Sequence, residues 1–246
     1  MKLLTWQVTA GVILVLVSAI FYLVQINVFG RVEDTFFYML QDLAFVPVQV
    51  LLVTLFLNEL FKKREKAELQ KKMNMVIGAF FGEVGTELVK LLMVFEDGSR
   101  GVASRLVFTK DWTGDEFTAA IKDVRAHDFA IDTRRGDLAA LKGFLTEKRA
   151  FMLGLLENPN LLEHESFTEL LWAVFHLTEE LSRRDGVSGL PATDYEHLGG
   201  DVRRAYSLLL SEWLAYNSHL KADYPYIYSL VMRTNPFDPD ARVEVG

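Results

Sequence analysis

The first sixty residues contain two long apolar runs with very few charges. No charged residue occurs from Leu3 to Gly30 or from Leu43 to Asn58. A helix of about 20 apolar residues is long enough to span the hydrocarbon core of a bilayer. The pattern therefore predicts a transmembrane hairpin at 1–61, with spans over about 5–28 and 38–60.

The first run has a second interpretation, as a signal peptide that is removed from the mature protein. Val17-Ser18-Ala19 resembles the small-residue site at which such peptides are cleaved. Apolar sequence continues beyond this point through Phe21, Leu23 and Val24, which favours an uncleaved span.

A cluster of basic residues follows the second run and predicts its orientation. Residues 62–72 hold six basic and two acidic side chains, whereas the short connection between the runs holds one arginine. Basic residues in short flanking segments stay on the cytosolic side. We therefore expect a multi-pass protein of the plasma (inner) membrane with both termini in the cytosol. This cluster, here called the basic collar, consists of Lys62, Lys63, Arg64, Lys66, Lys71 and Lys72.

The rest of the chain has helical spacing of its apolar residues, so the predicted fold class is all-α. A long helix over 62–96 is expected to continue from the second span, followed by a cytosolic helical bundle at 97–246 that ends in a C-terminal tail. Ser166 and Glu169 form a capping-box pattern that predicts a helix start. Gly199-Gly200 predicts a bend or an interruption in a later helix. Helices are expected over about 102–108, 113–127, 137–156, 167–183, 193–222 and 226–232.

Charge and composition exclude several classes of function. The chain of 246 residues has a formal charge of −7, and residues 73–246 hold 18 basic and 27 acidic side chains, so −9. An acidic domain without a basic patch is a poor ligand for nucleic acid, and none is expected as a partner. The chain has no cysteine, which excludes disulfides, thiolate metal sites and cysteine nucleophiles.

A few polar residues lie within the apolar runs at helical spacing. Small and amide side chains on one stripe are typical of helix contacts in lipid, where hydrogen bonds and close approach replace the hydrophobic driving force. The alternative is a water-lined pore with carboxylates near its outer mouth. Pro47 is expected to kink the second helix and is a candidate hinge. The intramembrane polar residues are Gln7, Ser18, Gln25, Asp42 and Gln49.

Two histidine–carboxylate pairs with a spacing of one helical turn are the best candidates for chemistry. His176 is followed by Glu180, and His197 by Asp201. Imidazole and carboxylate groups on facing helices can bind a divalent metal, although bundle proteins that bind two metals use Glu-x-x-His spacing instead. The alternative is a solvated or salt-bridged polar stripe, with no cofactor. No arrangement of a nucleophile with a base stands out, so the sequence gives no basis for naming an enzyme.

Three segments carry a resemblance to a known group of proteins. They are Asp-Leu-Ala-Phe-Val-Pro-Val-Gln from Asp42, His-Leu-Thr-Glu-Glu-Leu from His176, and Tyr-Pro-Tyr from Tyr224. In these segments the chain resembles an uncharacterised family of two-span prokaryotic membrane proteins with a helical cytosolic domain. The resemblance implies the same layout and no assigned activity.

Two classes of function remain from the sequence. A two-helix hairpin offers little surface to satisfy its own intramembrane Gln and Asp groups, so a homo-oligomer in the bilayer is expected. The first class is an ion channel or pore lined by the second span, with a regulatory cytosolic domain. The alternative is a membrane-anchored scaffold or signalling module whose cytosolic bundle binds a protein partner.

Overall fold

The computed structural model describes residues 2–98, 103–159, 161 and 164–244. The described residues form helices and connecting segments with no strand; an isolated bridge pairs Glu96 with Ile131. The chain divides into two compact units, Met1–Lys66 and Ala67–Gly246. The predicted all-α fold is confirmed.

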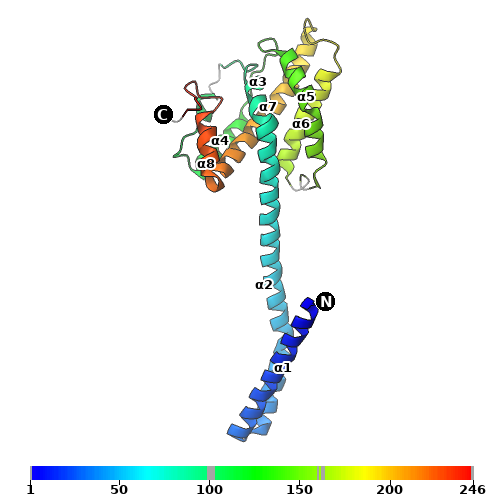
Figure 1. The fold of residues 1–246 in the computed structure, drawn as a ribbon, viewed down its shortest axis with the longest axis vertical. Coiled ribbons are helices and arrows are strands. Elements are labelled where there is room, and N and C mark those ends of the chain that lie inside the picture. Colours follow the sequence, from blue (N-terminus) through cyan, green and yellow to red (C-terminus); the bar gives the residue numbers. More distant parts are fainter. Residues whose placement is uncertain (1, 99–102, 160, 162–163, 245–246) are drawn as a thin grey trace. The chain divides into compact units, whose positions relative to one another are not determined.

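The first unit consists of α1 (Lys2–Phe29) and the first part of α2 (Val32–Phe80), which lie side by side as an antiparallel hairpin (Figure 1). Gly30 joins them with a φ of 62°, a conformation that favours glycine because it has no Cβ. By length and composition both helices could cross a membrane, and none of the residues in their most apolar stretches is buried. The helix α2 is assigned without interruption across Pro47, which itself has no backbone N–H to donate, and the expected kink at this residue stays a prediction.

The long helix predicted over 62–96 contains an irregularity that apolar spacing does not reveal. After α2, the five residues Phe81–Gly85 form a π-helical turn, and α3 (Thr86–Met93) follows directly. The Thr86 hydroxyl donates to the carbonyl of Phe81 at 2.8 Å, which satisfies an acceptor in this widened turn. The helical path thus ends at Met93.

Among its described residues, the second unit contains five further α-helices and a short 3₁₀ segment before α4. Thr113 caps α4 with a full capping box, and Asp137 caps α5, both at the expected helix starts. The segment expected as a helix over 102–108 is a single 3₁₀ turn where it is described. The elements are the 3₁₀ turn Ala103–Leu106, α4 (Gly114–Ala126), α5 (Leu138–Leu156), α6 (Glu165–Ser182), α7 (Ala192–Asp223) and α8 (Pro225–Arg233).

One local expectation is wrong, and two others are refined. The Ser166–Glu169 pattern does not start α6, because His164 is the N-cap and its Nδ1 accepts from the amide of Phe167 at 3.3 Å. Gly199-Gly200 does not interrupt α7, which is helical throughout, and the alternative of a bend there stays a prediction. The C-terminal tail after α8 is attached to the core at one residue, Phe237, which is 7 % exposed.

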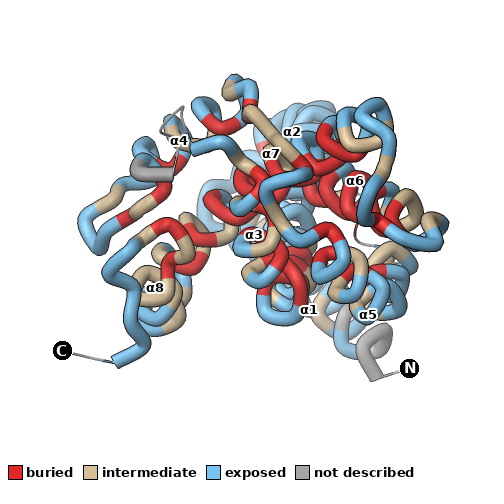
Figure 2. The backbone as a smooth tube through the Cα atoms, turned by 90° about the horizontal axis from the view of Figure 1, so that it is seen from above, coloured by how far each residue is buried: buried red, intermediate tan, exposed pale blue. Residues whose placement is uncertain are grey.

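The core of the second unit is built around α7, which packs against α3, α4, α6 and α8, while α5 covers α6. Buried residues therefore concentrate along α7, α6 and α3 (Figure 2). Trp213 and Tyr206 of α7 are among the largest side chains with almost no exposed surface. This packing fixes which residues of α6 and α7 meet.

Candidate functional site

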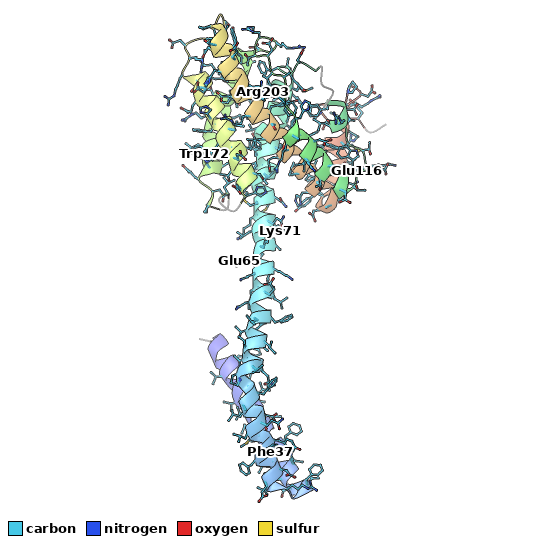
Figure 3. All side chains as sticks on the ribbon, turned by 180° about the vertical axis from the view of Figure 1, so that it is seen from behind. Phe37, Glu65, Lys71, Glu116, Trp172 and Arg203 are labelled. Carbon is cyan, nitrogen blue, oxygen red and sulfur yellow. The ribbon has the colours of Figure 1, made fainter. Side chains whose placement is uncertain are left out.

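Most of the described polar side chains of the two apolar runs are exposed on the surface of the hairpin. Ser18, Asp42 and Gln49 are exposed, and Gln25 is partly buried. The side chain of Gln7 lies outside those that the structure describes. In this chain alone, Asp42 and Gln49 therefore share the exposed apolar surface of α2, where aromatic residues such as Phe37 also project outward (Figure 3).

The basic collar lies on the exposed surface of α2, directly after its apolar part. All six basic side chains of the collar are exposed. Lys71 is one of them, and it follows Glu65 on the same helix (Figure 3). Positive charge is thus concentrated on the segment that follows the second apolar run.

The two predicted histidine–carboxylate pairs meet where α6 packs on α7. His176 and Glu180 lie one turn apart on α6, and His197 and Asp201 one turn apart on α7. The imidazole Nε2 of His176 is 3.6 Å from Oδ1 of Asp201. The Nε2 of His197 is 3.5 Å from Oδ2 of Asp201 and 3.6 Å from Oε2 of Glu180. The structure therefore brings all four residues into one group, here called the α6–α7 cluster.

Asp201 is the buried member of this cluster. Its residue is 6 % exposed, whereas the imidazole side chains of His176 and His197 are 48 % and 54 % exposed. The Oδ2 atom of Asp201 is buried and receives no hydrogen bond. A buried carboxylate without a hydrogen-bond donor is costly unless a positive charge compensates it.

Arg184 borders the cluster at the end of α6 and was not predicted as a site residue. Its guanidinium donates two hydrogen bonds to Asp194, at 2.7 and 3.0 Å, and one to Oε2 of Glu180 at 2.9 Å. These hydrogen bonds hold the pKa of both carboxyls, Asp194 and Glu180, below their ordinary values. The four-residue spacing from Glu180 to Arg184 is a signal that could have indicated this contact.

In their present positions these side chains do not enclose an ion. No group of three or more His, Asp or Glu side chains in the described part of the chain is placed to hold a metal. The geometry thus supplies donors of the correct type at one place, without a closed coordination shell. The metal prediction for these four residues stays a prediction.

A groove of about 470 Å³ opens along α4, on a different part of the second unit. His127 lines it, and the Nε2 of this residue is buried with no hydrogen-bond partner. Apolar walls with a few convergent polar groups are typical of sites for small ligands. The groove is lined by Arg105, Leu106, Trp112, Glu116, Ala119, Ala120, Asp123, Val124, Ala126 and His127.

Two family models match the chain over most of its length. Residues 2–61 match the model described as "MJ1433, N-terminal helical domain", and residues 69–233 match "Uncharacterized protein MJ1433, C-terminal helical domain". The chain belongs to the MJ1433 family. It is 42 % identical to the uncharacterized protein MJ1433 of Methanocaldococcus jannaschii over 233 residues, which cover 95 % of this chain and 94 % of that protein. No solved structure matches the chain.

The division between the two MJ1433 models coincides with features of this structure. The interval from 61 to 69 contains most of the basic collar and the boundary between the compact units at Lys66 and Ala67. The N-terminal model thus covers α1 and the apolar part of α2, and the C-terminal model covers most of the packed domain. The predicted resemblance to an uncharacterised helical family is confirmed at the level of the family and its helical domains.

Proposed function

We propose that this member of the MJ1433 family is a two-span protein of the plasma membrane that acts through its cytosolic helical domain, as a membrane-anchored scaffold or signalling module. The observation that carries the proposal is the exposure of α1 and the apolar part of α2, whose most apolar stretches bury no residue. Helices satisfy their own backbone hydrogen bonds, so such a surface is suited to lipid.

The orientation rests on the basic collar. Six basic side chains follow the second span, and one arginine, Arg31, lies in the connection between the spans. This distribution favours a cytosolic location for the collar, for the second unit and for both termini. The collar is also suited to contact the anionic headgroups of the cytosolic leaflet.

Self-association would supply partners for the polar groups on α2. Asp42 and Gln49 are exposed and seven residues apart, so they lie on one face of the helix. A carboxylate and an amide on a lipid-facing surface are costly, and contact with a second copy of the same helix would satisfy them. We therefore propose a homo-oligomer in the bilayer.

The candidate binding surfaces lie in the second unit, which favours this domain over the spans as the part that binds a partner. The second unit has both the groove along α4 and the α6–α7 cluster, each with a buried polar atom that lacks a hydrogen-bond donor or acceptor. These are features of a domain that binds a ligand or a protein partner. They support an anchored binding module, to which the hairpin contributes location and assembly.

An ion channel is the second candidate, because Asp42 and Gln49 on one exposed face could line a pore between subunits. The two candidates predict different effects of Asp42→Asn on self-association and on ion conductance. For the anchored module we expect weaker self-association and no conductance in either form. For the channel, wild-type protein conducts ions in planar bilayers and the Asp42→Asn variant has an altered conductance.

The first experiment is native mass spectrometry of the protein released from lipid nanodiscs, followed by conductance recordings. A dimer without conductance supports the anchored module, whereas a closed ring of four or more subunits with Asp42-dependent conductance would replace it with the channel. A monomer would contradict the proposed self-association.

Orientation is tested separately with single cysteines, since the chain has none. Glu33→Cys, between the spans, is expected to react with a membrane-impermeant maleimide in intact cells. Lys110→Cys, in the second unit, is expected to react only after lysis. Labelling of Lys110→Cys in intact cells would contradict the proposed orientation.

A further inference from the structure

In the α6–α7 cluster, the buried carboxylate of Asp201 has no hydrogen-bond donor at its Oδ2 atom. Asp201 is 6 % exposed, and its Oδ2 receives no hydrogen bond. Arg184, the guanidinium that borders the cluster, forms its ion pairs with Glu180 and Asp194. With neutral imidazoles, the three carboxylates and one guanidinium leave an excess of negative charge. The cluster is therefore suited to a cation.

The two imidazoles converge on one carboxylate, with Nε2 of His176 facing Oδ1 of Asp201 and Nε2 of His197 facing Oδ2 of the same group. The three imidazole–carboxylate separations are 3.6, 3.6 and 3.5 Å, at or beyond the limit for a hydrogen bond. In a tetrahedral zinc site with bonds of about 2.0–2.2 Å, neighbouring donor atoms lie about 3.3–3.6 Å apart. Each imidazole presents its Nε2, an atom that commonly ligates metals.

We propose that His176, His197 and Asp201, with Glu180 as the fourth donor, bind a divalent transition metal of the zinc class between α6 and α7. Imidazole nitrogen with carboxylate oxygen suits Zn²⁺ and its first-row neighbours, whereas Ca²⁺ and Mg²⁺ prefer oxygen alone. The proposal does not depend on the membrane location, because all four residues belong to the second unit.

Binding requires a change of side-chain position, since the four groups do not enclose an ion as they stand. The two imidazoles are about half exposed and have room to turn, whereas Asp201 is held by the packing of α7. The metal would draw His176 of α6 and His197 of α7 onto the same carboxylate. It would thereby cross-link the two helices that form the largest contact of the domain.

The direct test is a titration of the full-length protein in detergent, without a histidine tag and after dialysis against EDTA. Isothermal calorimetry is expected to detect about one Zn²⁺ per chain, and Co²⁺ to give the visible absorption of a tetrahedral complex. His176→Ala, His197→Ala and Asp201→Asn should each weaken Zn²⁺ binding more than about tenfold. Wild-type protein that binds no Zn²⁺ would overturn the proposal.

His219→Ala is the matched control. His219 lies on α7 and is 2.8 Å from a carboxylate oxygen of Asp223, four residues later, so it is another histidine–carboxylate pair on the same helix. Zinc affinity is expected to be unchanged in this variant. Equal weakening in His219→Ala and His197→Ala would place binding outside the cluster and overturn the assignment.

A second measurement separates metal binding from simple ion pairing of protonated histidines with Asp201. Metal ligation needs neutral imidazole, so Zn²⁺ should raise the Tm of the domain more at about pH 8 than at about pH 5.5, and EDTA should reverse the rise. Circular dichroism follows both, and the Asp201→Asn variant, whose isosteric side chain preserves the packing, should show no zinc-dependent rise. If acid alone raises the wild-type Tm and Zn²⁺ has no effect, the cluster is an ion-paired contact and the metal proposal fails.

Discussion

The two units of this chain place the same kind of side chain in opposite surroundings. Leu51 in the first unit is 57 % exposed, whereas Leu209 in the second is fully buried. Both lie in long helices, so helix propensity does not distinguish them. In water, burial of apolar surface stabilises a fold by about 25 cal/mol per Å². A helix that leaves such surface exposed gains nothing from this effect, and its folding instead depends on lipid or on contact with other helices.

Removal of the first unit is expected to have the largest effect, on the solubility of the protein in the absence of detergent. The fragment 67–246 contains its own core and should remain soluble and helical without detergent. The full-length chain should stay in the membrane fraction after an alkaline carbonate wash, because the most apolar stretches of α1 and α2 contain no buried residue. Circular dichroism of the fragment and blotting of the washed membranes measure the two outcomes.

Release of the full-length chain into the carbonate supernatant would contradict the contrast between the units. Aggregation of the fragment would show that the core of the second unit depends on residues before Ala67. A fragment that starts at Thr86, and so lacks the buried Phe80 and Phe81, serves as the control and should not fold.

Much of the fold was predictable because its signals are local. The absence of charge from Leu43 to Asn58 is a property of adjacent residues, as are the caps at Thr113 and Asp137. The start of α6 was not predictable, because two residues can act as its N-cap and the structure uses His164 rather than Ser166. Continuity of α7 at its two glycines depends on packing, since Leu198 and Val202 on either side are fully buried.

Single leucine truncations test the same contrast within one chain. Leu209→Ala should lower the free energy of unfolding of the domain by about 2–5 kcal/mol, because it leaves a cavity in a packed core. Leu51→Ala should change it by less than about 0.5 kcal/mol, since Leu51 is exposed and is not one of the core residues of the domain. Urea denaturation of full-length protein in detergent, followed by tryptophan fluorescence, measures both. Equal effects of the two variants would contradict the division into units.

The candidate site was predictable in part, for the same reason. The four-residue spacings of His176 to Glu180 and of His197 to Asp201 are local and were visible in the sequence. The sequence did not show that both imidazoles approach the same buried carboxylate. Their approach depends on how α6 and α7 are aligned along each other, and no pattern of neighbouring residues determines that alignment. Asp194 was missed because its partner, Arg184, lies across the connection between the two helices.

The caps of the second unit provide a smaller test. Thr113→Ala removes the side chain that accepts from the amide of Glu116 at the start of α4 and should cost about 1 kcal/mol of domain stability. Ser166→Ala should cost less than about 0.5 kcal/mol, because Ser166 lies inside α6 and does not cap it. Thermal unfolding of the two variants gives the comparison. A larger loss of stability for Ser166→Ala than for Thr113→Ala would support the capping box that the sequence predicted at Ser166.

Arg184 gives the smallest expected effect, and its sign is set by pH. The hydrogen bonds from Arg184 lower the pKa of Glu180 and of Asp194 in the folded state below their ordinary values of 4.5 and 3.8. A depressed folded pKa contributes stability that is present above the ordinary value and is lost as pH falls through the folded one. Wild-type protein should therefore be more stable than Arg184→Gln at neutral pH, and the difference should shrink as the pH falls below these ordinary values.

The control for this prediction is Arg183→Gln. Arg183 is 80 % exposed and lies 3.5 Å from Glu179, so its ion pair is strongly screened by water. Urea denaturation between neutral and acid pH should show little pH-dependent difference between this variant and wild type. A difference between wild type and Arg184→Gln that stays the same between neutral and acid pH would mean that Arg184 stabilises the end of α6 by packing and not through its ion pairs with Glu180 and Asp194. The apolar part of the Arg184 side chain would then hold the loop between α6 and α7, because such contacts do not change with the protonation of the two carboxylates.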